Sequence, residues 1–161
     1  MKLTTSVCIE APKAQTWKYL SDLERASDWV DALVTTKLED QNVRALGAIR
    51  VCTMTNGDKA RELFTAWSEG SSFTYEVLNA PMVKYASNAW SIVEVDGKSL
   101  VTSRAILELK GGIFGKAMGF VARIVAKRSM MKYLAAFKYL VENGRVYEGK
   151  SSDLPRISFT C

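Results

Sequence analysis

The stretch GGIFGKAMGFVARIVAKRSMMKYLAAFKYLVENG, residues 111–144, decides the fold of this chain. It contains no proline, and it is rich in Ala, Met, Leu and Lys, which favour a helix. Asn143-Gly144 is a suitable C-cap, because glycine readily adopts the left-handed conformation that ends many helices. The stretch therefore predicts one helix over residues 113–142, on the order of 45 Å long.

The residues before this helix predict about six β-strands, because short runs of alternating, β-branched and aromatic residues are separated by turn residues. The predicted strands are residues 34–39, 48–54, 61–67, 73–78, 85–95 and 99–109. Asn56-Gly57, Glu69-Gly70-Ser71 and Asp96-Gly97 supply turn chemistry between neighbouring runs. Links this short join antiparallel strands, whereas parallel strands need long crossovers. We therefore expect an antiparallel meander.

The N-terminal part predicts one more strand and two short helices. Residues 3–9 are rich in β-branched side chains, and Pro12 follows at a position where proline opens helices. Apolar residues continue at helical spacing to Leu23, and residues 26–30 indicate a second short helix. A single sheet needs cover on one face, and only the long helix is large enough to provide it. The expected fold class is therefore α+β.

Length and composition indicate a single ordered domain. The chain has 161 residues, of which 48% are hydrophobic and 24% charged, a mixture typical of globular proteins. We expect one domain over residues 1–144 and an irregular C-terminal extension over residues 145–161. The net charge of +5 permits an acidic ligand, an anionic surface or nucleic acid as partner, but requires none of them.

The residue types that the chain lacks exclude several kinds of site. The sequence has no histidine, which excludes Ser-His-Asp and Cys-His catalysis and every imidazole metal ligand. Its three cysteines, Cys8, Cys52 and Cys161, are far apart, so neither a zinc site nor a disulfide framework is indicated. We expect no metal and no cofactor. The odd cysteine count and an N-terminus without an apolar signal segment favour a cytoplasmic protein.

Several motifs follow one another in the order found in the SRPBCC superfamily. They are Ala11-Pro12 with Trp17-Lys18-Tyr19-Leu20 and Trp29, then Gly47 to Arg50 with Asn56-Gly57 and Glu62, then Ser72-Phe73-Thr74-Tyr75-Glu76-Val77, and then Ser87-Asn88-Ala89-Trp90-Ser91. The chain resembles this superfamily, in particular its polyketide cyclase/dehydrase-like branch, from Leu3 to Asn143. The resemblance implies a START-like helix-grip fold, in which a curved sheet of about seven strands and the long helix enclose an elongated ligand cavity, with the two short helices after the first strand.

Strand alternation predicts which side chains of the first hairpin face this cavity. We expect Val51 to share the inner face with Glu62, Phe64 and the small Ala66. Arg50 alternates with Val51, so we expect it on the outer, solvent face and assign it no catalytic role.

The last two strands are harder to orient. We expect Ala89, Ser91 and Val93 to face inward, together with Ser103, because this choice keeps the charged neighbours in solvent. It also places Trp90 outside, which is unfavourable for so large an apolar side chain, and a slip of one residue would reverse it.

Nine residues are candidates for binding a ligand in the cavity. They are Trp29, Val51, Glu62, Phe64, Tyr75, Ser91, Ser103, Met118 and Phe137. The small inward residues favour an open space, since a solid core would need larger ones. The alternative is that Met118, Phe137 and other large residues of the long helix fill the room.

Two kinds of function remain open on this evidence. The first is a carrier or sensor that encloses an apolar small molecule such as a lipid, isoprenoid, quinone or polyketide-like compound. The second is a cyclase/dehydrase-type or lyase enzyme, with Glu62 as general base and Tyr75 as hydrogen-bond donor to a developing enolate. Without histidine these two residues are nearly the only catalytic candidates, and Glu62 could equally form a structural hydrogen bond.

The long helix also carries a basic stripe, formed by Lys116, Arg123 and Lys127. A solvated helix face explains such a stripe, and transient docking on an anionic membrane surface is the alternative. Nucleic-acid binding is not expected, because no exposed aromatic residues accompany the basic ones.

Overall fold

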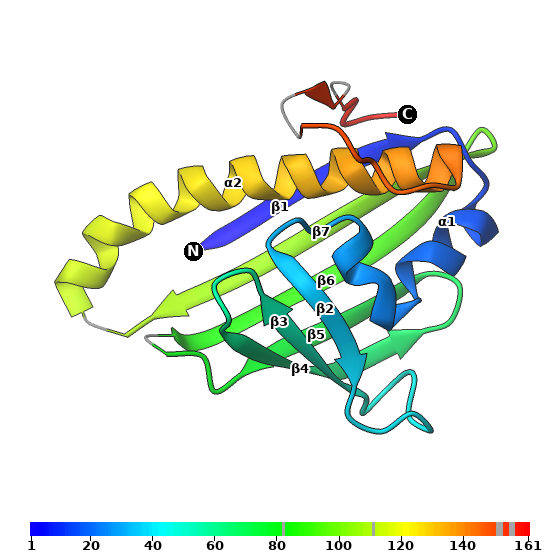
Figure 1. Cartoon of the computed structure of the whole chain (residues 1–161). Coiled ribbons are helices and arrows are strands. Elements are labelled where there is room, and N and C mark those ends of the chain that lie inside the picture. The colour runs from blue at the N-terminus through cyan, green and yellow to red at the C-terminus, as the bar shows by residue number, and fades with distance from the viewer. Residues whose placement is uncertain (82, 111, 151–152, 155–156) are drawn as a thin grey trace.

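The computed structural model describes residues 1–81, 83–110, 112–150, 153–154 and 157–161, and for residues 112–122 the backbone alone (Figure 1). Seven antiparallel strands form one sheet in the order β1-β7-β6-β5-β4-β3-β2. The strands are β1 Lys2–Ile9, β2 Leu33–Leu38, β3 Ile49–Met54, β4 Lys59–Ser68, β5 Ser72–Leu78, β6 Val83–Val95 and β7 Lys98–Leu109. The predicted meander is confirmed.

In the described part of the chain, three helices accompany the sheet. They are α1 Lys13–Leu20, the 3-10 helix η1 Leu23–Asp28 and the long α2 Gly112–Asn143. Figure 1 shows α2 lying along one face of the sheet, as the sequence predicts. Among the described residues, no helix combines the length and the hydropathy needed to cross a bilayer.

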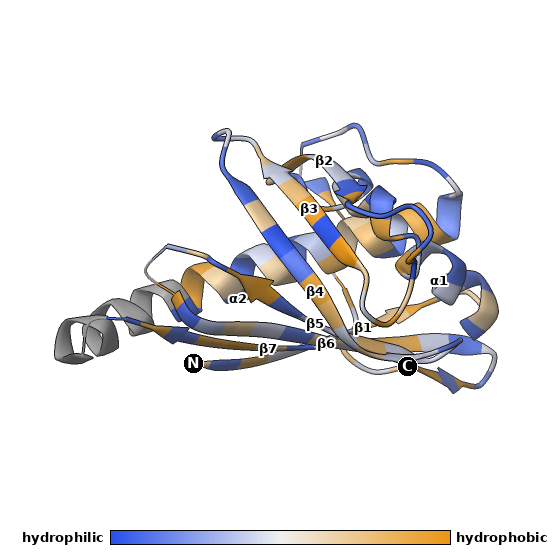
Figure 2. Cartoon of the chain, turned by 90° about the horizontal axis from the view of Figure 1, so that it is seen from below, coloured by the Kyte–Doolittle hydropathy of each residue, from blue (hydrophilic) through white to orange (hydrophobic). Residues whose placement is uncertain are grey.

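The sheet is strongly bent, and its concave side holds the core. In Figure 2 the strands β2, β3 and β4 run at a steep angle to the layer of β1, β6 and β7. The second half of α2 buries Leu134, Phe137 and Leu140 almost completely in this core. Because α2 packs on only part of the concave side, space remains beneath η1 and the bent strands.

The hairpin of β3 and β4 has a different register from the predicted one. Met54 N–H donates to the Asp58 carbonyl (2.8 Å) and Gly57 has φ 89°, so the turn contains three residues, not the two of Asn56-Gly57. The extra residue places Arg50 opposite Glu62. Directly opposed residues lie on the same face of a sheet. Arg50 therefore faces inward and Val51 faces outward, and the prediction for both was wrong.

A β-bulge changes the end of the same strand. The pairing of β4 with β5 shifts between Phe64 and Ala66, so that Trp67, not Ala66, lies opposite Phe73. A bulge adds one residue to one strand and reverses the alternation beyond it. Ala66 is exposed for this reason, contrary to the prediction that it faces the cavity.

The hairpin of β6 and β7 corrects the facing of β6. Asp96 and Gly97 both have positive φ, and they form a two-residue turn between Val95 and Lys98. This turn sets Trp90 opposite Ser103, and both side chains are buried. Ser91 pairs with Thr102 on the convex side. The prediction was therefore right for Ser103 and wrong for Ala89, Ser91, Val93 and Trp90.

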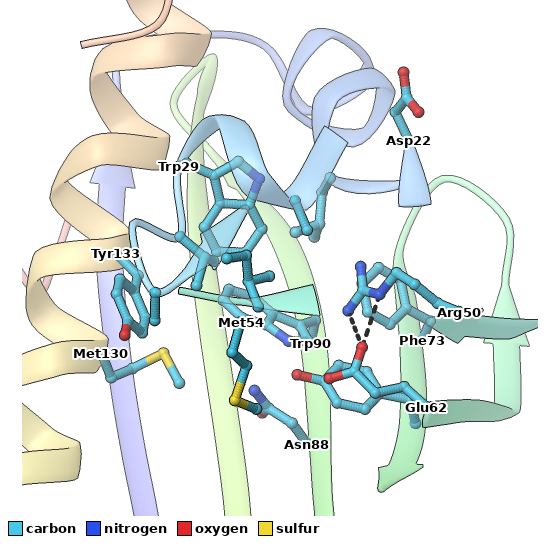
Figure 3. Close-up of a pocket in the computed structure, with 16 residues that line it drawn as sticks. Asp22, Trp29, Arg50, Met54, Glu62, Phe73, Asn88, Trp90, Met130 and Tyr133 are labelled. Atoms are coloured by element: carbon cyan, nitrogen blue, oxygen red, sulfur yellow. Dashed lines mark hydrogen bonds and ion pairs between the residues drawn. The ribbon is translucent and has the colours of Figure 1, made fainter. Parts of the chain in front are cut away.

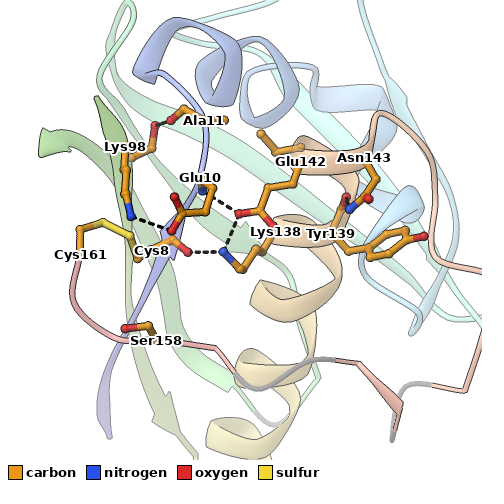
Figure 4. A network of polar contacts seen from close by, with 12 residues as sticks. Cys8, Glu10, Ala11, Lys98, Lys138, Tyr139, Glu142, Asn143, Ser158 and Cys161 are labelled. Atoms are coloured by element: carbon orange, nitrogen blue, oxygen red, sulfur yellow. Dashed lines mark hydrogen bonds and ion pairs between the residues drawn. A yellow bond between two sulfur atoms is a disulfide. The ribbon is translucent and has the colours of Figure 1, made fainter. Parts of the chain in front are cut away.

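The C-terminal extension is joined covalently to the first strand. Cys161 forms a disulfide with Cys8 of β1, across a sequence separation of 153 residues. The Ser158 carbonyl accepts a hydrogen bond from the Cys8 N–H (2.9 Å), and Lys138 of α2 donates to the Cys8 carbonyl (2.8 Å). Figure 4 shows these contacts around β1 and the end of α2. The positions of the cysteines in the sequence did not indicate this disulfide. The expectation of a reducing compartment rested on cysteines without a disulfide pattern, so the disulfide removes that support.

Removing the disulfide should destabilise the protein. We expect Cys161→Ser to lower the free energy of unfolding by about 2–5 kcal/mol, because the cross-link restricts the unfolded chain. Urea unfolding with and without dithiothreitol measures this loss. The reductant should affect the wild type and leave Cys161→Ser unchanged. Equal midpoints for the two proteins under oxidising conditions would contradict the pairing.

Candidate functional site

A cavity of about 230 Å³ lies between the bent strands, η1 with the loop that follows it, and α2 (Figure 3). Its lining residues are Leu20, Asp22, Ala26, Trp29, Val30, Ala32, Leu33, Arg50, Met54, Glu62, Phe73, Tyr75, Asn88, Trp90, Met130 and Tyr133. Figure 3 shows two sides: Trp29, Met130 and Tyr133 on one, and Arg50 with Glu62 on the other. The site therefore has an apolar wall and a polar end.

The apolar wall is built from aromatic and methionine side chains. Trp29 makes an edge contact with Trp90, with ring centroids 5.5 Å apart, and another with Phe137 at 5.1 Å. Met54 and Met130 lie beside them, and unbranched methionine side chains adapt easily to the shape of a partner. This side of the cavity can therefore enclose a flat or flexible apolar group.

The polar end is a buried ion pair between Arg50 of β3 and Glu62 of β4. Arg50 Nη2 lies 2.5 Å from Glu62 Oε2, and Arg50 Nε donates to the same oxygen at 2.7 Å. The two side chains are only 8% and 12% exposed. Burial on its own lowers the pKa of Arg50, but the adjacent Glu62 carboxylate raises it above its ordinary value. The guanidinium therefore stays charged.

Aromatic rings and a thiol surround this ion pair. The Arg50 guanidinium lies over the rings of Phe64 and Tyr75, 5.4 and 5.3 Å from their centroids. Cys52 Sγ donates to Glu62 Oε2 at 3.3 Å. Burial, and then the Glu62 charge, raise the pKa of the Cys52 thiol to about 12. A thiol with that pKa is protonated and unreactive at neutral pH.

Asn88 and Tyr75 extend the polar end. The Ser103 hydroxyl donates to Asn88 Oδ1 at 2.8 Å, which orients the amide, and Asn88 lies directly opposite Tyr75 in the pairing of β5 with β6. Burial, followed by the Glu62 charge, raises the pKa of Tyr75, so its hydroxyl keeps its proton. Hydrogen-bonding groups of Asn88 and Tyr75 can therefore meet a ligand beside the charge-compensated ion pair.

The structure separates eight of the nine predicted site residues into three groups. Trp29, Glu62 and Tyr75 line the cavity. Phe64, Ser103 and Phe137 are buried behind its wall, where they support Arg50, Asn88 and Trp29. Val51 and Ser91 lie on the convex side, for the register reasons given above. The side chain of Met118 lies outside the described residues.

Sequence reasoning missed Arg50, Asn88 and Trp90 as lining residues, and one available signal could have found two of them. A two-residue turn at Asp96-Gly97 requires Trp90 to face Ser103, and Asn88 to face Ala105. Because Ser103 was expected to face inward, this pairing required Trp90 to face inward as well. Arg50 had no such signal, because the sequence of the first turn also fits the two-residue form.

The fold and the site can now be compared with known proteins. The family described as "Polyketide cyclase / dehydrase and lipid transport" matches residues 1–142. The chain belongs to this family. Its membership confirms the superfamily resemblance, and the coarse expectation of a ligand-binding fold of this kind is also supported. A search of curated proteins by sequence found no match.

Solved structures of members of this fold are similar at low sequence identity. An uncharacterised protein from Bacillus thuringiensis superposes with a TM-score of 0.71 at 18% identity, over 88% of this chain and 98% of the other. Norcoclaurine synthase from Thalictrum flavum, in complex with a transition-state analogue, gives 0.68 at 15% identity, over 89% and 95%. Ara h 8.0201 gives 0.66 at 15% identity, over 88% and 97%. These similarities establish the helix-grip fold.

Breaking the ion pair should strongly destabilise the protein. Glu62→Gln leaves the Arg50 guanidinium buried without its counterion, and we expect a loss of about 3–5 kcal/mol in the free energy of unfolding. Glu39→Gln is the matched control, because Glu39 pairs with Arg61 on the surface at 2.6 Å, where solvent screens the interaction. Urea unfolding compares the two. If Glu62→Gln lowered the free energy of unfolding no more than Glu39→Gln does, the buried ion pair between Arg50 and Glu62 would be contradicted.

Stability should also fall at alkaline pH. The pKa of Cys52 is about 12 in the folded protein and about 8.5 in an unfolded chain. Because the folded value is the higher one, this contribution is complete below about pH 8.5 and is lost as the pH rises towards 12. Tyr75, with a raised pKa, adds a loss of the same sign above about pH 10. Urea midpoints measured across this range should decline less steeply for Cys52→Ala, and an unchanged slope would refute the assignment.

Proposed function

We propose that this protein binds one neutral, mainly apolar small molecule inside the cavity, as a carrier or sensor. The observation that supports this proposal is a partly enclosed cavity with an apolar wall of Trp29, Trp90 and Met130 at one side and a buried polar cluster at the other. Burial of apolar surface would supply most of the affinity, and the polar cluster would fix the orientation.

Charge balance supports a neutral ligand. Arg50 and Glu62 compensate each other, so the buried polar end holds no net charge to bind a carboxylate or an amine. The other charged lining residue, Asp22, is exposed to solvent. An ionised ligand would lose its hydration without gaining a free counterion, which is costly. A hydroxyl or carbonyl oxygen, in contrast, can exchange hydrogen bonds with Asn88 and Tyr75.

The size of the cavity favours a compact ligand. Its volume of about 230 Å³ is just below the range of about 300–1,000 Å³ usual for small-molecule sites. One or two rings, or a short isoprenoid or polyketide-like chain, suit this space better than a full-length lipid. Rotation of Met54 or Met130 would enlarge it.

The ion pair also disfavours the enzymatic alternative. A cyclase/dehydrase mechanism on Glu62 needs a buried carboxylate that is free to accept a proton, whereas Oε2 of Glu62 already accepts hydrogen bonds from Arg50 and Cys52. This arrangement fits the alternative in which Glu62 forms a structural interaction. Tyr75 can still donate a hydrogen bond to a ligand, but its protonated hydroxyl cannot act as the general base.

Binding can be tested with matched probes. We expect 2-naphthol to quench the fluorescence of Trp29 and Trp90, and to bind at least about tenfold more tightly than 2-naphthoate, which corresponds to about 1.4 kcal/mol. Ala32→Phe fills part of the cavity and should abolish this quenching. Val34→Phe is the control, because Val34 lies only two residues further on, in β2, and is 58% exposed.

Native mass spectrometry of the purified protein, followed by organic extraction, would identify a natural ligand. A co-purifying neutral compound would support the proposal. Equal binding of 2-naphthol by Ala32→Phe and Val34→Phe would place the ligand outside the cavity. Tighter binding of 2-naphthoate than of 2-naphthol would contradict the proposal of a neutral ligand.

A further inference from the structure

The middle of α2 exposes apolar and basic side chains together. Ile124 and Val125 are 42% and 57% exposed. Arg123, Lys127 and Arg128, their neighbours on the helix, are exposed too. In the second half of the same helix, by contrast, the apolar residues are buried in the core. A solvated helix face explains the three basic residues but does not explain two large aliphatic ones beside them.

The charge of this helix is strongly one-sided. Between Glu108 and Glu142 the sequence has no acidic residue, and its basic residues are Lys110, Lys116, Arg123, Lys127, Arg128, Lys132 and Lys138. Lys132 pairs with Asp31, and Lys138 pairs with Glu142. None of the ion pairs between described residues involves Arg123, Lys127 or Arg128. Three positive charges are therefore available to an external partner.

The sequence extends the apolar pattern towards the start of the helix. Ile124 and Val125 end a series at spacings of three and four residues that also includes Phe114, Ala117, Met118 and Val121. Such spacing is typical of an amphipathic helix.

We infer that residues 123–128 of α2 form a docking surface for an anionic lipid bilayer. Ile124 and Val125 would enter the boundary between headgroups and acyl chains, while Arg123, Lys127 and Arg128 contact lipid phosphates. Helices that lie in a membrane interface combine these two features. A soluble polyanion would leave the aliphatic pair exposed, and a second copy of this chain would bring two basic surfaces together.

The docking surface lies next to the cavity on the same helix. Met130 and Tyr133, which line the cavity, follow Arg128 by two and five residues. Docking would bring this wall of the cavity close to the lipid. The inference does not depend on the proposed ligand, because the surface residues are distinct from the cavity lining and binding to vesicles needs no ligand in the cavity.

Vesicle co-sedimentation tests the inference directly. The full chain should sediment with vesicles of phosphatidylcholine mixed with phosphatidylglycerol, and not with pure phosphatidylcholine. Each basic residue near an anionic surface contributes about fivefold to binding. The triple variant R123E/K127E/R128E should therefore bind at least about tenfold more weakly. Raising salt from about 0.1 M to about 1 M should release the protein, since the Debye length shrinks to about 3 Å.

Two further variants separate docking from non-specific attraction. I124S/V125S removes only the aliphatic contact and should weaken binding severalfold at unchanged net charge. K37E/K59E/R104E makes the same charge change at exposed residues outside α2 and should bind nearly as the wild type does. The thermal unfolding of each variant confirms that it folds.

The inference is wrong if the wild type binds neither kind of vesicle or binds both equally. It is also wrong if R123E/K127E/R128E and K37E/K59E/R104E lose binding to the same extent. A dimer that I124S/V125S dissociates, without any vesicle binding, would assign the surface to self-association and likewise reject the bilayer.

Discussion

The buried ion pair of Arg50 and Glu62 constrains the structure around it more than any other described contact in the cavity. Removing either partner leaves a charge inside the core, and a slip of one residue between β3 and β4 would turn Arg50 out to solvent and have the same effect. The pair therefore stabilises the register that the three-residue turn sets. Phe64 and Tyr75 lie against the Arg50 guanidinium, and Arg50 also donates to the Leu23 carbonyl at 3.4 Å. The ion pair therefore connects three strands and η1 at one end of the cavity.

Under the proposed function, the same pair determines which ligand the cavity would recognise. Opposite charges that satisfy each other leave a polar but neutral surface, and the oriented amide of Asn88 beside the Tyr75 hydroxyl adds directional hydrogen bonds. The opposite wall of Trp29, Trp90 and Met130 offers only apolar contact. A ligand with one neutral polar group and a compact apolar body matches both sides. The second half of α2 closes the core, while residues 123–128 carry exposed basic side chains that form no ion pair with another described residue.

Most of the fold could be predicted from sequence, and the errors at the site have one physical origin. The strands, the turns and the long helix all lie within a residue or two of their expected positions, because hydrophobic period and turn residues are local signals. The facing of side chains depends on turn length, and one extra residue in the turn at Asn56-Gly57 moved Arg50 inside. At Asp96-Gly97 the two-residue turn was readable, and applying it to Ser103 would have placed Trp90 correctly.

The sequence by itself determined the order of elements, the antiparallel meander, the single long helix and the absence of histidine chemistry, since each of these depends on composition or on neighbouring residues. Only the tertiary structure decided the partner of Glu62 and the disulfide between Cys8 and Cys161. These pairings depend on register and on chain closure over long separations. Alternation along one strand carries no information about which residue of another strand lies opposite.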